Sequence, residues 1–466
     1  MSKTYFVLFI LCLFFFIVKI IAIRLTNFDL FGDEAQYWLW SQNLDFGYYS
    51  KPPLLSWIIA AVCFIFGSSV FVIKMISVIF YCLTSFIIFL LSKKLINDSE
   101  LAFLTATTFF LMPAVSFSSF LVSTDIVLIF FWSLSLLQLL NIKGNPNKLN
   151  FILLGIFVGL AFLAKYAAIY FVFCVMLMFL EKEMRDIFLR HKLSFLYFIL
   201  TIGLVVSPNI IWNVNNNWIT LQHIVDNTAL NRTSLNFING LEFIVSQIIM
   251  IGPLIFIFFV FGVVNNLNIN FSTRFLFIFS LPILFIILIE SILVRANANW
   301  AAVSLISFLI LFVHSTFMVN KKILVINNVL NLFFGIGFFF LVGMSSSYGI
   351  FKRIDGISSF ANSLIEINNR HNDNRIVVSD RMLFSNLSYI FHNKLIEMYV
   401  PHVPNTKIGH HFQITNALPA DFNKNFFFIG HIDQLQYLKN IHKINLLDFK
   451  VVRFNKDPIK IYEVIF

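Results

Sequence analysis

Long apolar runs separated by short polar segments occupy the first three-quarters of the chain. Most of these runs are long enough to cross a bilayer as helices. They lie near residues 6–23, 70–91, 101–121, 123–141, 150–164, 166–180, 193–212, 241–264, 274–293, 299–318 and 323–345. The pattern predicts a polytopic α-helical membrane protein with about eleven transmembrane helices.

Two runs near the N-terminus need separate interpretation. Residues 54–67 are apolar but number only about fourteen, which suits an interfacial or re-entrant helix better than a crossing. Residues 6–23 form a longer run than a signal-peptide core, and no small-residue cleavage pattern follows them. We therefore expect 6–23 to be an uncleaved first span.

The pattern changes near residue 347, where charged residues return and apolar runs shorten to the length of strands. The expected strands lie at 376–378, 426–429, 451–452 and 459–465, with helix-like stretches at 358–369 and 381–391. The sequence therefore predicts a transmembrane domain over 1–346 and a small α/β domain over 347–466. After an odd number of spans, the small domain lies on the opposite side of the membrane from the N-terminus.

Composition excludes several classes of protein. With 59% hydrophobic residues, 12% charged residues and a mean hydropathy of +0.85, the chain cannot be a soluble protein. Its net charge of +10 is spread over loops and the C-terminal third without a basic stripe, so no nucleic-acid partner is expected. The four cysteines lie in apolar segments without ligand-like spacing, which encodes neither a disulfide framework nor a metal site.

The distribution of Lys and Arg predicts the orientation in the membrane. If the N-terminus is cytoplasmic, twelve of these residues flank the inner ends of the spans and seven flank the outer ends. This arrangement places the loop 24–69, the later polar residues and the C-terminal domain on the outer face. The inner loops are then short connectors, and the chemistry of the protein is expected on one face.

The first outer loop carries the densest group of polar and aromatic residues. Residues 31–53 combine the adjacent carboxylates Asp33 and Glu34, the ring of Tyr37 and other aromatic residues, and Lys51 before two prolines. A carboxylate at a half-dry interface gains basicity and suits a general base, and an ammonium held there suits a phosphate. The alternatives are solvated loop acids and a lysine that reaches lipid headgroups.

Two later segments place charges at the ends of apolar runs. Asp125 begins a span, so it either faces a cavity or caps a helix. Lys165 and Tyr166 interrupt an apolar stretch, and this lysine either marks a turn or binds phosphate.

The segment 295–300 offers a cation and amides in a short outer loop. Arg295 and Asn299 could clamp phosphate oxygens or sugar hydroxyls, with Trp300 beside them. The alternative is that these residues only anchor the loop at the membrane interface.

The motifs in this region, taken together and in order, resemble the bacterial branch of glycosyltransferase family 39. They are Asp33-Glu-Ala-Gln-Tyr-Trp-Leu-Trp40, Tyr48-Tyr-Ser-Lys-Pro-Pro53, Ser123-Thr-Asp125, Ala164-Lys-Tyr166, Ser207-Pro-Asn-Ile-Ile-Trp-Asn213 and Ala298-Asn-Trp300. The family contains GT-C-type membrane enzymes similar to protein O-mannosyltransferases, lipid A aminoarabinose transferases and rhizobial galacturonosyltransferases. The resemblance is specific over residues 30–300 and loose after 347.

The resemblance implies an inverting transfer of a monosaccharide from a polyprenyl-phosphate donor, at an active site in the first outer loop. Asp33, with Glu34 beside it, would be the base or would position the acceptor, and Lys51 would contact the donor phosphate. Asp125 and Lys165 would line the cavity. Aminoarabinose transferases have an acidic residue before Lys-Pro-Pro, and Ser50 at this position argues against that narrow activity.

The physical chemistry of this reaction asks for phosphate neutralisation by Lys51, Lys165 or Arg295 in a low-dielectric cleft. Whether a divalent cation shares this task is open from the sequence. Expected partners are the lipid-linked donor, a lipid or protein acceptor and the bilayer, at the periplasmic face of a bacterial inner membrane. A transporter or flippase is the main alternative, and an oligosaccharide polymerase or ligase a third; the internal repeats of the former and the large outer loop of the latter are absent from the sequence.

Overall fold

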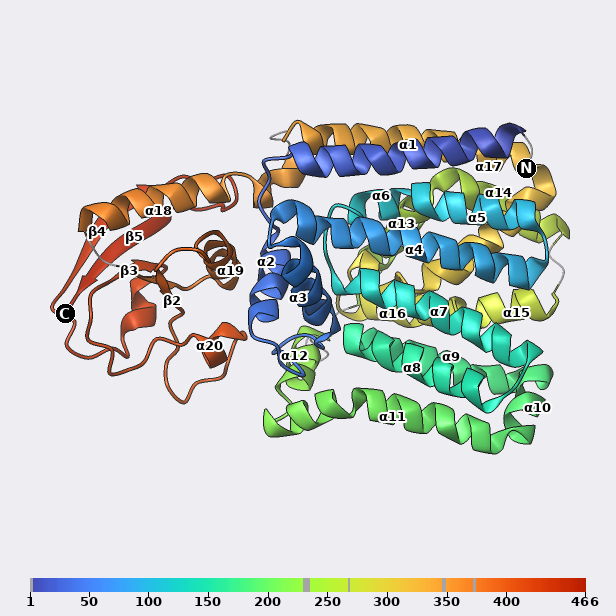
Figure 1. The fold of residues 1–466 in the computed structure, drawn as a ribbon, viewed down its shortest axis with the longest axis horizontal. Helices are drawn as coiled ribbons and strands as arrows, with labels where there is room; N and C mark the ends of the chain where they lie inside the picture. The colour runs from blue at the N-terminus through green and yellow to red at the C-terminus, as the bar shows by residue number, and fades with distance from the viewer. Residues whose placement is uncertain (1–2, 229–234, 267–268, 346–348, 372–373) are drawn as a thin grey trace.

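The computed structural model describes residues 3–228, 235–266, 269–345, 349–371 and 374–466. A bundle of helices forms the larger part, and a smaller α/β domain adjoins one end of it (Figure 1). The helices α2 (Gly32–Gln42), α3 (Leu54–Phe66) and α12 (Ile219–Thr228) lie at that end, between the long helices and the C-terminal domain. We call it the domain-facing end.

Six helices among the described residues are long and apolar enough to cross a membrane. They are α1 (Lys3–Leu25), α4 (Val70–Ile96), α7 (Thr124–Gly144), α11 (Lys192–Asn215), the consecutive α15 (Phe271–Ile278) and α16 (Leu281–Leu293), and α17 (Ser304–Gly343). The helices α13 (Phe237–Ile251) and α14 (Pro253–Asn266) meet at a bend of 104° and make a seventh if they are one span. The predicted count of eleven is therefore not confirmed.

Shorter apolar helices account for the remaining predicted runs. They are α5 (Ser99–Leu111), α6 (Pro113–Ser118), α8 (Lys148–Ala164) and α9 (Ile169–Leu177). The polar helix α10 (Lys182–Arg190) and the 3-10 turns η1 (Tyr166–Ala168), η2 (Met178–Leu180) and η4 (Ala298–Ala301) are further short elements. The helix α3 has thirteen residues and lies at the domain-facing end, where the sequence predicts an interfacial helix.

The long helix α17 consists of two helices joined at Asn320. This residue has φ −165° and ψ 110°, which is extended rather than helical backbone. Just after it, Lys321 bonds to Glu100, which also contacts Tyr5 at the start of α1, whereas Gly343 packs against the last turns of α1. The second half of α17 therefore runs alongside α1, and the two halves correspond to the predicted runs 299–318 and 323–345.

Close packing rather than hydrophobic transfer holds such a bundle together, because lipid tails are as apolar as the side chains. Gly155 and Gly159, one turn apart on α8, face α11. A Cβ atom at Gly155 would lie 2.7 Å from the Phe198 carbonyl oxygen, and one at Gly159 would lie 2.7 Å from Val205. These glycines let the two helix backbones approach closely.

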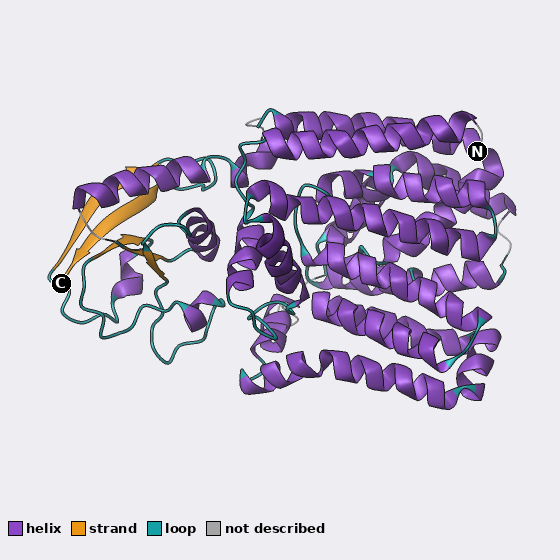
Figure 2. Ribbon diagram, in the orientation of Figure 1, coloured by secondary structure: helices purple, strands orange, loops and turns teal. Residues whose placement is uncertain are grey.

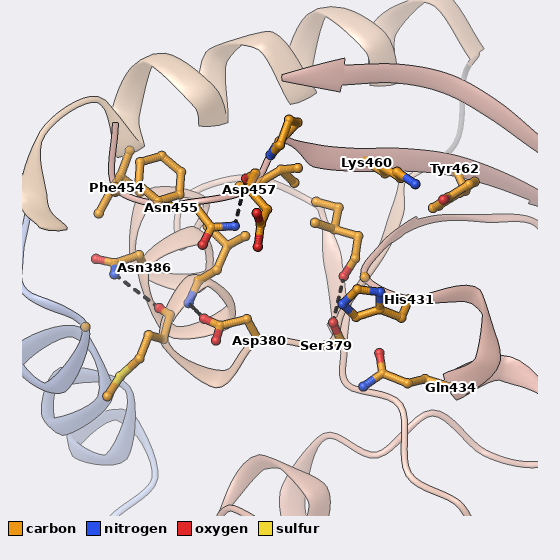
Figure 3. Close-up of a pocket in the computed structure, with 18 of the residues that line it drawn as sticks. Ser379, Asp380, Asn386, His431, Gln434, Phe454, Asn455, Asp457, Lys460 and Tyr462 are labelled. Carbon is orange, nitrogen blue, oxygen red and sulfur yellow. Dashed lines mark hydrogen bonds between the residues drawn. The ribbon is translucent and has the colours of Figure 1, made fainter. Parts of the chain in front are cut away.

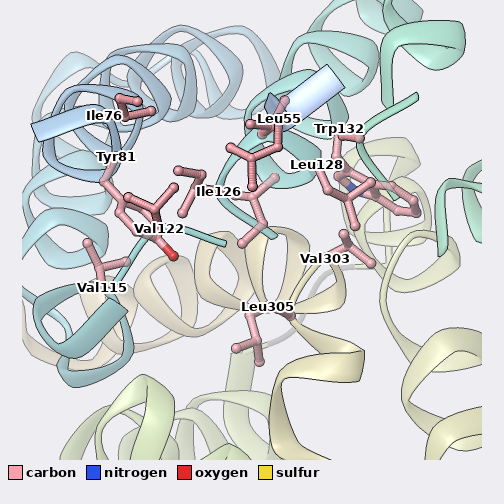
Figure 4. Close-up of a cluster of buried hydrophobic side chains, with 14 of the residues drawn as sticks. Leu55, Ile76, Tyr81, Val115, Val122, Ile126, Leu128, Trp132, Val303 and Leu305 are labelled. Carbon is pink, nitrogen blue, oxygen red and sulfur yellow. The ribbon is translucent and has the colours of Figure 1, made fainter. Parts of the chain in front are cut away.

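Large side chains fill the centre of the bundle. Figure 4 shows a part of this core, where residues of α3, α4, α7 and α17 meet. Trp132 is fully buried there, with its ring edge against Phe171 at 5.0 Å between centroids. Leu55, Ile126 and Leu305 are also almost fully buried. This core fixes the start of α7, which carries Asp125.

The C-terminal domain contains a mixed sheet, whose strands are orange in Figure 2. It has five strands in the order β2-β1-β3-β5-β4. The strands are β1 (Arg375–Val378), β2 (Glu397–Tyr399), β3 (Phe426–Ile429), β4 (Lys443–Lys450) and β5 (Ile459–Ile465). The strands β2, β1 and β3 are parallel, and β5 pairs antiparallel with both β3 and β4. The domain also has α18 (Ile357–His371), α19 (Arg381–Ile390), α20 (Phe412–Thr415), η5 (Gly349–Ile354) and η6 (Ile432–Leu435).

The predicted α/β character of this domain is confirmed, with two differences in its strands. The expected strand at 451–452 is wrong, because the polar-alternating β4 occupies residues 443–450 and ends just before it. The short β2, where Glu397 interrupts the apolar residues of 395–400, was not predicted. The predicted domain boundary between residues 346 and 347 lies outside the described residues.

Helix α19 joins the C-terminal domain to α2. A Cβ atom at Gly32, the first residue of α2, would lie 2.7 Å from the side chain of Met382, so α2 and α19 are in close contact. Trp38 packs edge-on against Tyr389 at 4.8 Å between ring centroids. Ser358 donates to Asp29 from both its backbone N–H and its hydroxyl. The domain is therefore attached directly to the loop that carries the predicted site.

Candidate active site

A cavity of about 750 Å³ opens at the domain-facing end of the bundle. Its walls come from α2, the loop before α3, the start of α7, the α8–η1 junction, α12, the η4 turn and α19. Most of the residues predicted from the sequence line it. These are Asp33, Tyr37, Lys51, Asp125, Lys165, Tyr166, Asn299 and Trp300.

Asp125 and Lys165 form an ion pair inside the cavity. The Lys165 Nζ lies 2.7 Å from Asp125 Oδ1, and Asn299 Nδ2 donates to the other oxygen at 2.8 Å. Asp125 lies in the first turn of α7, where the helix dipole favours a carboxylate, but Ser123 and not Asp125 occupies the N-cap position. Lys165 ends α8 in an extended conformation, so it both marks a turn and reaches the cavity.

Lys51 is the second ammonium in this cavity. The loop before it is closed by a hydrogen bond from the Tyr48 N–H to the Lys51 carbonyl, and the Tyr48 ring stacks on Trp40 at 4.5 Å. Burial lowers the pKa of Lys51, and the neighbouring charge of Lys165 lowers it further. Among the described residues none forms a hydrogen bond or ion pair with its ammonium, so this charge is available to an anion.

Asp33 lies in the first turn of α2 and lines the same cavity. It is half-buried, and within the described parts of the chain no side chain pairs with its carboxylate. Tyr37, one helical turn further on, is buried beside it. Burial, and next the charge of Asp33, raise the pKa of Tyr37 well above its ordinary value, so its hydroxyl stays protonated.

Glu34 points away from the cavity. Its side chain is 1% exposed, with Oε2 2.7 Å from Lys74 Nζ. Its oxygens also accept hydrogen bonds from the backbone N–H of Phe31 at 2.8 Å and of Val122 at 2.7 Å. Adjacent residues on a helix point about 100° apart, so the two carboxylates that are neighbours in sequence have different surroundings. The structure gives Glu34 a structural ion pair rather than access to a substrate.

Arg295 lies apart from Lys51 and Lys165. It lines a separate cavity of about 280 Å³ with Glu242 and Ser291, between α13 and α16. The structure therefore does not bring this arginine to the cavity that holds the other two predicted phosphate ligands.

Amide side chains connect α11 to the first loop. Tyr166 donates to Asn209 Oδ1 at 2.6 Å and accepts from Asn213 Nδ2 at 3.1 Å. Asn209 Nδ2 in turn donates to the Phe46 carbonyl at 2.6 Å. The motif 207–213 therefore positions Tyr166 and the loop 43–53, and does not itself line the cavity.

Three cavity residues were missed by the sequence analysis. Arg381, the first residue of α19, reaches in from the C-terminal domain, and its Nη1 donates to Gln36 Oε1 at 3.2 Å. His223 of α12 and Glu290 of α16 also line the cavity. Burial lowers the pKa of His223, and the charges of Lys51 and Arg381 lower it further, so it is neutral near pH 7. Nothing local in the sequence marks these residues, because the fold alone brings them to the loop 31–53.

A second, mostly apolar cavity of about 380 Å³ adjoins the first. The two share Ser123, Asp125 and Asn299 on their walls. The remainder of the second cavity is formed mainly by apolar side chains, including Phe109 and Leu305. A polar chamber that continues into an apolar one suits an amphipathic ligand whose charged group lies near Asp125 and Lys165.

No three His, Cys, Asp or Glu side chains gather as metal ligands among the described residues.

The chain is similar to several known proteins. A family model described as dolichyl-phosphate-mannose-protein mannosyltransferase matches residues 50–212. The chain is 27% identical over 425 residues to lipid A galacturonosyltransferase RgtD of Rhizobium johnstonii, covering 88% of each chain. Crystal structures of ArnT from Cupriavidus metallidurans, in the apo state and bound to undecaprenyl phosphate, match with TM-scores of 0.71 and 0.72 at 12% identity, covering 99% of this chain and 98% of theirs.

The matches confirm the resemblance drawn from the motifs. The chain is similar in sequence to a lipid A galacturonosyltransferase and shares the fold of ArnT. Its six described helices of spanning length are those of a multi-pass membrane protein, and one of the matched ArnT structures contains undecaprenyl phosphate.

Proposed function

We propose that this protein is an inverting glycosyltransferase that moves a monosaccharide from a polyprenyl-phosphate donor to an acceptor of the cell envelope. The reaction takes place at the periplasmic face of a bacterial inner membrane. The acceptor is lipid A, the lipopolysaccharide core or a protein.

The observation that supports this proposal best is the division of charge within one cavity. Asp125 already neutralises Lys165, whereas the Lys51 ammonium and the Asp33 carboxylate have no ionic partner among the described residues. A transfer from a lipid phosphate needs these two free groups: a cation for the leaving phosphate and a base for the acceptor.

The donor fits the paired cavities. Its phosphate would lie near Lys51 and Lys165, and the first isoprene units of its lipid chain would enter the apolar cavity beside Asp125. Transfer of the donor phosphate from water to this half-buried site favours the charged form of Lys51, which burial otherwise disfavours.

The chemistry then requires one proton transfer and one displacement. The acceptor hydroxyl loses its proton to Asp33 as its oxygen attacks the anomeric carbon from the face opposite the phosphate. The bond between that carbon and the phosphate oxygen breaks, and the electron pair leaves with the lipid phosphate. Lys51 stabilises the charge that grows on the leaving group. The anomeric configuration inverts because there is a single displacement.

The test is a comparison of envelope glycolipids in a strain that lacks the gene. Mass spectra of lipid A and core oligosaccharide are recorded after complementation with wild type, Asp33→Asn and the control Asp186→Asn, whose side chain is 40% exposed on α10. We expect wild type and the control to add a mass of one sugar and Asp33→Asn to lose it, because a general base contributes roughly 10²–10⁴-fold. Equal restoration by Asp33→Asn at equal expression would exclude Asp33 as the base. An unchanged glycolipid and glycoprotein profile with wild type would favour a transporter instead.

A further inference from the structure

The C-terminal domain has a topological switch point that no part of the transfer reaction uses. The chain leaves β1, passes through α19 and enters β2 on one side of β1, and later enters β3 on the other side. The strands β1 and β3 are parallel neighbours, so the loops after their carboxyl ends diverge. Ligands of open α/β sheets bind in the crevice that such diverging loops create.

A cleft of about 950 Å³ lies at this point (Figure 3). The loop after β1 contributes Ser379 and Asp380, and the loop after β3 contributes Gly430 and His431. Gly430 has φ +159°, and a Cβ atom there would lie 2.3 Å from the Ser379 hydroxyl oxygen. Only glycine allows the two loops to come this close at the base of the cleft.

The cleft has apolar walls and a polar rim. The apolar part includes Phe31, Ile357, Leu383, Phe454 and Ile459. The polar part combines acidic, amide and basic side chains: Asp380, Asn386, His431, Asp433, Gln434, Asn455, Asp457, Lys460 and Arg353. Figure 3 shows Asp457, Asn455 and Phe454 from the segment before β5 opposite Ser379 and His431. Within the described residues, neither Asp433 nor Asp457 forms an ion pair.

The lining disfavours two common ligand classes. The N-terminus of α19, which could otherwise hold an anion such as a nucleotide phosphate, is already capped by Asp380, which accepts from the Leu383 N–H at 2.7 Å. The three aspartates of the lining add negative charge. A divalent cation would need several ligands together, and no such group exists in the described parts of the chain.

The same lining suits a saccharide. A sugar ring presents hydroxyl groups that both donate and accept at its edge, and apolar C–H groups on its faces. The rim offers carboxylate and amide acceptors together with lysine and arginine donors, and the ring of Phe454 offers an apolar surface.

We propose that this cleft is a second carbohydrate site, which holds the saccharide part of the acceptor beside the transfer cavity. The inference rests on the proposed transferase function and narrows its acceptor to a saccharide-bearing molecule. Continuity along α2 supports it: Gly32 lines the cleft and Asp33, the next residue, lines the transfer cavity. The same holds at the start of α19, where Asp380 lines the cleft and the next residue, Arg381, lines the transfer cavity.

The experiment measures binding apart from transfer. Full-length protein in lipid nanodiscs is titrated with a β-linked glucosamine disaccharide as the probe, followed by saturation-transfer difference NMR. The variants are Asp433→Asn and Asp457→Asn, and the matched control is Asp421→Asn, an exposed aspartate of the same domain outside the cleft. We expect saturable binding by wild type and the control, and roughly tenfold weaker binding by each cleft variant, because a charged hydrogen bond is lost.

Four outcomes are decisive. Absence of saturable binding by wild type would overturn the inference, and so would equal binding by the cleft variants and wild type. In a transfer assay, the cleft variants should raise the acceptor KM and leave kcat unchanged; a reduced kcat at unchanged KM would also overturn it. Binding of the probe by a wild-type protein that transfers no sugar would instead refute the proposed function and leave the cleft as a carbohydrate site.

Discussion

The ion pair between Glu34 and Lys74 gives the sharpest test of how the site is built. The sequence predicts that Glu34 acts beside Asp33, whereas the structure buries it against Lys74 with both side chains at most 1% exposed. The substitution Glu34→Gln keeps the size of the side chain and removes its charge. It leaves the Lys74 ammonium with the Phe120 carbonyl at 3.2 Å and the Phe120 ring as its remaining contacts.

The expected cost follows from the burial of the pair. Removing one partner of a buried ion pair destabilises a protein by about 3–5 kcal/mol, because the other charge remains buried and unpaired. The double substitution Glu34→Gln with Lys74→Met removes both charges and should be less destabilising than the sum of the two single changes. We expect a coupling energy of about 2–3 kcal/mol, within the range for residues in direct contact.

Unfolding in a titration with sodium dodecyl sulfate measures these differences in detergent-solubilised protein. Sugar transfer is measured in parallel and expressed per folded molecule. Glu34→Gln should lose stability and keep most of its activity per folded molecule, since its side chain does not reach the cavity. A variant of wild-type stability without activity would refute this assignment and would return Glu34 to a chemical role.

Three further predictions test the cavity and its attachment to the C-terminal domain. Lys51→Met should raise the donor KM at least tenfold, because one charged contact to phosphate is lost. Burial lowers the pKa of Lys51, whereas a guanidinium stays charged, so Lys51→Arg should keep donor binding and extend it to higher pH. Measurements of the donor KM between pH 7 and 10 test both changes. Arg381→Gln should weaken substrate binding by about tenfold without loss of folding, whereas removal of its single described partner in Gln36→Ala should have a smaller effect on the same KM. Burial, with His410 beside it, lowers the pKa of His411 to about 4, so below pH 6.5 the unfolded chain binds a proton at this position that the folded chain does not bind. This group alone should therefore lower the stability by about 2 kcal/mol between pH 7.5 and 5 in thermal unfolding, and the profile of His411→Gln should be flatter by that amount.

The sequence predicts those parts of the fold that depend on one property, the length of an apolar run. Apolar length locates the helices of the bundle, and a run too short to span marks α3 correctly. The number of membrane crossings is harder to predict, because it also depends on bends within a helix, which the length of an apolar run does not show. Residues 241–264 read as one apolar run, yet the chain bends by 104° between α13 and α14.

The sequence predicts site residues where charged side chains lie next to apolar runs. It does not predict where a side chain points in the folded chain. Asp33, Lys51, Asp125 and Lys165 are costly beside lipid, and that cost makes them recognisable in the sequence. Glu34 is equally costly, but its partner Lys74 is forty residues away, so the sequence cannot tell a buried pair from a free base. The position of Arg381 depends on the docking of a domain more than three hundred residues further along the chain.

The arrangement of α2 and α19 suggests how one membrane fold can serve different acceptors. The groups proposed to bind the donor phosphate, Lys51 and Lys165, belong to the bundle, where any polyprenyl-phosphate sugar presents the same leaving group. The proposed acceptor cleft belongs almost entirely to the C-terminal domain, and of the described residues of the bundle only Phe31 and Gly32 reach it. Changes in the loops after β1 and β3 can therefore alter the acceptor without disturbing Asp33 or Lys51. A division of this kind explains why chemistry-bearing motifs are dense before residue 300 while the tail after 347 keeps only a loose resemblance to the family.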